Sequence, residues 1–284
     1  MEKILVPTDF TPIAENGLRL AVEIARRSGA VISLINFTKH PFGRTFSATG
    51  DVYKKNDVED SVFMLELLKQ NQRKLEELAE TYRAADVEIE YGIIDDELKD
   101  GIDDYLDKEL IDIVVMGTSG EASVEEQFTG NRTEQVIEVS SCPVLSVRDG
   151  FRIEDLSRIV LAVNEIDDNQ ILTGLNTLRQ LAESFGSHIY MLHVRRPSSD
   201  ERDLRVYFEG MARTAALQDY TITILDAADP AEAVIDFARE NQAGLIAVIK
   251  NSKDGIFRIF SNHFSNRLVK EVGRPVFTFN LQNA

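Results

Sequence analysis

The feature that most constrains this chain is an internal repeat. The segment Lys3-Ile-Leu-Val-Pro-Thr-Asp9 returns as Arg158-Ile-Val-Leu-Ala-Val-Asn164. Near the other end of each copy, Cys142-Pro143-Val144 returns as Arg274-Pro275-Val276. Self-similarity over so long a spacing indicates two copies of one folding unit.

The length of the chain fits two copies, because 284 residues are enough for two domains of ordinary size. The second copy is the shorter one, and much of the difference lies in a long irregular segment of the first copy, Thr38–Asp60. A loop of that length is usually functional or disordered, so it is either a lid over a ligand site or a surface loop. We predict a boundary near Gly150, with domains at residues 1–150 and 151–284.

Apolar runs alternate with amphipathic helical patterns in each copy. This alternation predicts an α/β fold, a parallel sheet covered by helices on both faces. Right-handed crossovers then give a doubly wound sheet, with ligands at the carboxyl ends of the strands. In the first copy we expect strands at residues 3–8, 31–37, 87–93, 113–116 and 144–147, and helices at 12–27, 61–85, 97–109 and 131–140. In the helix over 61–85, the residues expected to face inward are Leu65, Leu68, Leu75, Leu78 and Ala79.

A glycine-containing loop follows the strand at residues 113–116. Gly117, Gly120 and Gly130 punctuate it before the helix at 131–140. A strand, a glycine loop and a helix can together hold a phosphate, because the backbone comes close and N–H groups at the helix start point at the anion. The loop has neither the GxxxxGK[ST] lysine nor the GxGxxG spacing.

This loop resembles the nucleotide-binding subset of the universal stress protein family, whose members carry G-x2-G-x9-G-[S/T]. The three glycines match, Thr133-Glu134 matches the usual continuation, and Asn131 stands where Ser or Thr is expected. The opening ILVPTDF, with Asp9 just past the first strand, is a second match. The resemblance implies two tandem five-stranded sheets of Rossmann-like, adenine-nucleotide alpha-hydrolase-like type, each with strand order 3-2-1-4-5.

The resemblance also implies a set of nucleotide contacts in the first copy. Pro7, Thr8 and Asp9 would lie by the base and ribose, and Phe37 would flank the adenine. The residues expected at the ribose and phosphates are Met116, Gly117, Ser119 and Gly120, and those expected at the phosphates alone are Gly130, Asn131, Arg132 and Thr133. Two alternatives stay open, in which Asp9 caps the following helix and Phe37 is a core residue.

The charge of the chain bears on the ligand. The formal net charge is −17, which excludes nucleic acid and anionic membrane surfaces as expected partners. Residues 1–150 carry most of it, with 16 Lys and Arg against 30 Asp and Glu. Glu121, Glu125 and Glu126 lie in the glycine loop itself. Adenosine, AMP or ATP with Mg²⁺ is therefore an easier ligand for this loop than free ATP.

The second copy lacks the motif. Ile249 stands in place of Gly117, and Asn164 in place of Asp9. The other two glycines are replaced by Ser252 and Asn262. We therefore expect the second copy to bind no nucleotide.

Other features argue against catalysis and for a reducing compartment. The single cysteine, Cys142, excludes an internal disulfide and is interpreted as a packed thiol. The His188–His193 separation places the two rings on opposite faces of a strand, which does not suit a metal pair. No GxSxG or HExxH motif is present. No apolar run approaches the ~20 residues needed to span a membrane, and no apolar signal segment opens the sequence. We expect a cytoplasmic protein.

Three functional hypotheses follow. In the first, the chain is a regulatory, non-catalytic stress protein that binds ATP or AMP through its first copy. An unknown protein partner then recognises the conformational change that binding causes. In the second, it is a nucleotide-free interaction scaffold. The resemblance implies that residues 144–147 and 276–279 then pair within the chain as a pseudo-dimer, or that the chain forms a homodimer. In the third, it is a slow, Mg²⁺-dependent ATP hydrolase.

Overall fold

The computed structural model describes residues 1–39, 57–119, 132–163, 171–195, 201–250 and 274–281. The strands are β1 (Lys3–Pro7), β2 (Val31–Phe37), β3 (Ile89–Ile94), β4 (Ile113–Gly117), β5 (Val144–Val147), β6 (Arg158–Ala162), β7 (His188–Arg195), β8 (Tyr220–Asp226), β9 (Leu245–Lys250) and β10 (Val276–Asn280). The helices are α1 (Pro12–Ser28), α2 (Asp57–Thr81), α3 (Leu98–Lys108), α5 (Arg132–Val139), α6 (Ile171–Phe185), α7 (Glu201–Thr214) and α8 (Pro230–Glu240). The described segments alternate strand and helix from β1 to β5 and from β6 to β9, as the sequence predicts.

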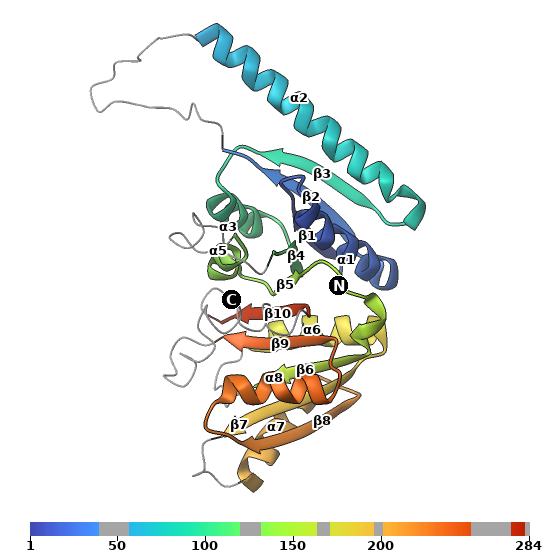
Figure 1. The fold of residues 1–284 in the computed structure, drawn as a ribbon, viewed down its shortest axis with the longest axis vertical. Coiled ribbons are helices and arrows are strands. Elements are labelled where there is room, and N and C mark those ends of the chain that lie inside the picture. The colour runs from blue at the N-terminus through green and yellow to red at the C-terminus, as the bar shows by residue number, and fades with distance from the viewer. Residues whose placement is uncertain (40–56, 120–131, 164–170, 196–200, 251–273, 282–284) are drawn as a thin grey trace, which may run out of the picture.

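The strands form a single sheet of ten, in the order β3-β2-β1-β4-β5-β10-β9-β6-β7-β8 (Figure 1). Each half has the predicted order 3-2-1-4-5 with parallel neighbours. The two halves join where β5 and β10 pair antiparallel, with Leu145 opposite Phe277. The predicted pairing within the chain is confirmed, and the two expected five-stranded sheets are one continuous sheet.

The core on one face of this sheet belongs to both halves. Leu18 of α1 and Leu175 of α6 lie in the same buried cluster, together with Leu145 and Phe277 from the two joining strands. All four side chains are at most 1% exposed. The opposite face has two separate clusters, one per half. Part of the apolar surface on this face is therefore buried between the two halves.

Local signals fix the first helix at the place that the sequence predicts. Thr11 is the N-cap of α1 and accepts a hydrogen bond from the Ala14 N–H at 3.2 Å, and Pro12 follows at the first helical position. Gly29 ends the helix with φ of 75°, a left-handed conformation that favours glycine. The N-cap of α1 is thus Thr11 and not Asp9. Asp9 lies two residues before this cap.

The helix α2 differs from its prediction in two respects. It begins at Asp57, inside the segment expected to be irregular, whereas residues 40–56 lie outside the described part of the chain. Leu75 is fully buried as expected, but the prediction for Leu65 is wrong, because its side chain is 53% exposed. In Figure 1, α2 runs beside the edge strand β3 and diverges from it towards the N-terminus of the helix, so the N-terminal turns lie away from the sheet. None of the described helices is long and apolar enough to cross a membrane.

Candidate functional site

A pocket of about 860 Å³ opens at the carboxyl ends of β1, β2 and β4. The N-termini of α1, α3 and α5 also reach it. The structure brings nine of the predicted site residues together around this pocket: Pro7, Thr8, Asp9, Phe37, Met116, Gly117, Ser119, Arg132 and Thr133. The other three, Gly120, Gly130 and Asn131, lie outside the described residues.

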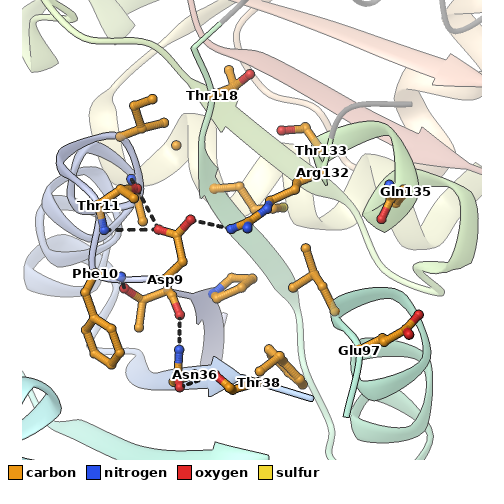
Figure 2. Close-up of a pocket in the computed structure, with 18 of the residues that line it drawn as sticks. Asp9, Phe10, Thr11, Asn36, Thr38, Glu97, Thr118, Arg132, Thr133 and Gln135 are labelled. Carbon is orange, nitrogen blue, oxygen red and sulfur yellow. Dashed lines mark hydrogen bonds and ion pairs between the residues drawn. The ribbon is translucent and has the colours of Figure 1, made fainter. Parts of the chain in front are cut away.

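Asp9 joins two elements across the pocket. One of its carboxylate oxygens forms an ion pair with the Arg132 guanidinium at the start of α5 (Figure 2). The other accepts hydrogen bonds from the Thr11 N–H at 3.1 Å and from the Thr11 hydroxyl at 2.6 Å. The Asp9 side chain is 35% exposed and that of Arg132 is 61% exposed, so a ligand entering the pocket can reach both.

Asn36 forms a buried polar network beneath the pocket. Its side-chain N–H₂ donates to the Thr8 carbonyl at 2.7 Å (Figure 2). Its side-chain oxygen accepts from the Thr38 hydroxyl at 2.7 Å and from the Asn71 amide at 3.0 Å. Asn71 belongs to α2, so this network ties α2 to the ends of β1 and β2. The sequence analysis missed both asparagines. The available signal was a polar residue inside the apolar run Val31–Phe37.

Two lysines at the pocket were also missed. The Lys39 ammonium lies 2.5 Å from a Glu97 carboxylate oxygen at the start of α3. This hydrogen bond raises the pKa of Lys39. The Lys74 ammonium, from α2, lies 5.0 Å from the centre of the Phe10 ring, a cation–π contact. The positive charges at the pocket are therefore already engaged by groups of the protein.

The lining is electrically balanced. Its described residues include three cations, Lys39, Lys74 and Arg132, and three carboxylates, Asp9, Asp96 and Glu97. The strong negative charge of residues 1–150 is thus not concentrated among the described lining residues.

Gly117 is a glycine because of how α1 packs on β4. A β-carbon at this position would lie 1.6 Å from the Ile13 carbonyl oxygen. Conversely, a β-carbon on Gly17 would lie 2.6 Å from the Gly117 nitrogen. Gly117 does line the pocket, but close approach of helix and strand is sufficient reason for its missing side chain.

Phe37 packs against α3 and also faces the pocket. Its ring meets Tyr105 edge-on, with the ring centres 6.4 Å apart. A β-carbon on Gly101 would lie 2.6 Å from the Phe37 ring, so α3 also approaches it closely. Phe37 is half-buried and lines the pocket, so core packing and a place beside a ligand are compatible roles.

Comparison with known proteins decides the family. The model of the universal stress protein family matches residues 1–148, more than half of the chain. The chain belongs to the universal stress protein family.

Relatives agree with this assignment. Universal stress protein YxiE of Bacillus subtilis is 27% identical over 146 residues, covering 51% of this chain and 98% of that protein. The putative universal stress protein SH1215 of Staphylococcus haemolyticus is 32% identical over 151 residues, covering 52% of this chain and 84% of that protein. A crystal structure of a universal stress protein from Archaeoglobus fulgidus superposes with a TM-score of 0.70 at 17% identity, covering 98% of this chain and 96% of that chain. The last likeness extends the universal stress protein fold to the full length of this chain.

The second half repeats the backbone around Thr8 and Asn36 with different side chains. The Val163 N–H donates to the Leu192 carbonyl at 2.9 Å, as the Thr8 N–H does to Ile35. Nδ1 of His193 lies 3.0 Å from the Val163 carbonyl oxygen, the place that the Asn36 amide takes in the first half. His193 then packs on Phe208, with the ring centres 5.1 Å apart. An aromatic contact thus replaces the Asn36–Asn71 hydrogen bond.

Two other residues singled out in the sequence, Ile249 and Cys142, are packing residues, whereas Asn164, Ser252 and Asn262 lie outside the described segments. Ile249, in the place of Gly117, is buried in the core at 1% exposure. Burial raises the pKa of the Cys142 thiol to about 12, which keeps it neutral and unreactive, as the sequence analysis expects of a packed thiol. Within the described segments, no group of three His, Cys, Asp or Glu side chains is arranged to hold a metal ion.

Proposed function

We propose that this protein is a cytoplasmic regulatory member of the universal stress protein family that binds an adenine nucleotide in the pocket of residues 1–150. The observation that carries the proposal is that nine of the residues implied by the family resemblance line one pocket at the carboxyl ends of β1, β2 and β4. In open α/β sheets, ligands bind in the crevice at those ends, where the strand order reverses.

The physical character of the pocket supports a nucleotide. Its volume of about 860 Å³ lies within the usual range of small-molecule sites. Three helix N-termini meet there, and each presents N–H groups and a partial positive charge that favour an anion. Phe37 and Met116 give an apolar wall for a base, and Arg132 stands at the start of α5 for a phosphate.

The charge balance favours a ligand of low charge. With as many carboxylates as cations among the described lining residues, the pocket offers little net attraction to the charges of free ATP. AMP, or ATP with Mg²⁺, is the ligand we propose. Mg²⁺ would reduce the repulsion between the phosphates and Asp9, Asp96 or Glu97.

Calorimetry tests this function. ATP, ADP and AMP are titrated into the full chain with and without Mg²⁺. The site variant is Gly120→Val with Gly130→Val. The matched control is Gly210→Val, since Gly210 lies on an exposed position of α7 and an added β-carbon there meets no atom within 4 Å. We expect binding by the wild type and the control, and its loss in the double variant. No binding of any nucleotide by the wild type contradicts the proposal.

An interaction scaffold that needs no nucleotide is the second candidate. The observation in its favour is the continuous ten-stranded sheet, in which β5 and β10 pair and the two halves share a core. This leaves β3 and β8 as the outer strands. If no nucleotide binds, the scaffold is tested by the molar mass in solution, which distinguishes a monomeric pseudo-dimer from a homodimer. ADP formation in the ATP samples tests slow hydrolysis.

A further inference from the structure

We infer that Asp9 inhibits the site from within, by holding the Arg132 guanidinium that an anionic ligand must take. The inference rests on the proposed function, because it concerns how an anion gains entry to the same pocket. Within the described residues of the pocket, the Asp9 carboxylate thus competes with the ligand for Arg132.

The contacts define the competition. The Asp9–Arg132 ion pair spans the pocket from the end of β1 to the start of α5 (Figure 2). A carboxylate and a phosphate use the same donors of a guanidinium, and both form charge-assisted hydrogen bonds with it. While Asp9 occupies Arg132, an incoming phosphate must displace a carboxylate that remains within the pocket. The displaced carboxylate then repels the phosphate.

A second ion pair in the pocket lining repeats the arrangement. Lys39 is held by Glu97 at 2.5 Å, again between elements that border the pocket. Two of the three cations among the described lining residues are thus paired with carboxylates of the same lining. This pattern gives a pocket that discriminates by charge: a neutral adenosine meets no competitor, whereas a phosphate competes with a side chain at each paired cation.

Asp9→Asn isolates the charge. The asparagine Oδ1 can still accept from the Thr11 N–H and hydroxyl, so the turn before α1 is kept. The negative charge that holds Arg132 is removed. Because exposed ion pairs and single repulsive charges are each worth up to about 1 kcal/mol, we expect AMP to bind Asp9→Asn about three- to tenfold more tightly than the wild type. Adenosine has no phosphate, so its affinity measures any contact of Asp9 with the base or ribose, and we expect the ratio of AMP affinity to adenosine affinity to rise about three- to tenfold.

A second background separates competition from simple repulsion. In Arg132→Gln there is no guanidinium to compete for, so adding Asp9→Asn removes only the repulsion between its carboxylate and the phosphate and should improve AMP binding by less than it does in the wild-type background. A gain in that background as large as in the wild-type background overturns the inference, because Asp9 then acts by repulsion alone.

The outcomes for the inference and for the proposed function are distinguishable. If the wild type binds AMP and the ratio of AMP affinity to adenosine affinity is equal or lower in Asp9→Asn, the inference fails while the proposed function stands. If neither protein binds AMP or adenosine, the proposed function fails and the inference with it. An AMP affinity that rises relative to the adenosine affinity in Asp9→Asn, with dependence on Arg132, supports both.

Discussion

The α-carbon of Gly117 packs against the main-chain carbonyl of Ile13, so that a β-carbon at position 117 would lie 1.6 Å from the Ile13 oxygen. The same position borders the candidate nucleotide pocket. A substitution at Gly117 therefore changes helix packing and the pocket at once.

Gly117→Ala should destabilise the protein. Overpacking of a backbone contact typically costs about 1–3 kcal/mol, and the short distance places this position at the upper end of that range. The free energy of unfolding is measured in urea. Gly210→Ala is the control, because it has open space on α7 and should be neutral or stabilise by up to about 1 kcal/mol. Wild-type stability for Gly117→Ala would refute the packing explanation. A loss of ligand binding in a Gly117 variant is not by itself a sign of lost phosphate contacts.

Two leucines of α2 should respond differently to the same change. Leu75 is fully buried, so Leu75→Ala should cost about 2–5 kcal/mol of unfolding free energy. Leu65 is 53% exposed, so Leu65→Ala should stay within about 0.5 kcal/mol of the wild type. Chemical denaturation of the two variants side by side measures the difference. Equal losses of unfolding free energy in the two variants would mean that Leu65 is buried in solution.

The Asn36–Asn71 hydrogen bond should appear as an energetic coupling. Asn36→Leu leaves the Thr8 carbonyl and the Asn71 amide without the partners that Asn36 gives them, which should cost about 1–3 kcal/mol. Asn71→Leu removes the amide that donates to the Asn36 side-chain oxygen. Because the two residues share one hydrogen bond, the double variant should lose less than the sum, with a coupling of about 0.5–1.5 kcal/mol. Strict additivity in the unfolding free energies would exclude the coupling.

Cys142 predicts a pH dependence at high pH. Burial raises the pKa of its thiol from 9.0 to about 12 in the folded state. Above pH 9 the unfolded chain releases this proton and the folded chain keeps it, so the stabilisation is present below pH 9 and lost as pH rises toward 12. From pH 9 to pH 10 the wild type should lose about 1 kcal/mol of unfolding free energy relative to Cys142→Ala. The difference between the two denaturation curves at each pH measures this. Parallel behaviour of the two proteins would contradict a buried, neutral thiol.

The sequence was sufficient for the order of elements and for nine of the residues that line the pocket. Asp9 and Gly117 each follow an apolar run, and run ends are visible in a sequence. The pairing of Asp9 with Arg132 spans 123 positions, and nothing local specifies it. Asn71 looks like a solvent-facing residue of a helix until Asn36 is placed beneath it. The prediction that Leu65 is buried failed for a related reason. Apolar periodicity defines a helix face but does not show where the neighbouring sheet ends.

The antiparallel pairing of β5 with β10 has a consequence for how the sequence of this protein can diverge. In a homodimer made from one repeated gene product, the interface is self-complementary and every substitution occurs twice. Here Ser146 lies opposite Val276, and its equivalent position on the other strand, Thr278, lies opposite Val144. A substitution in one half is not copied into the other. Covalent linkage thus lets the second half carry Ile249 at the position where the first half keeps Gly117. Because both halves belong to one chain, they are always present in a one-to-one ratio.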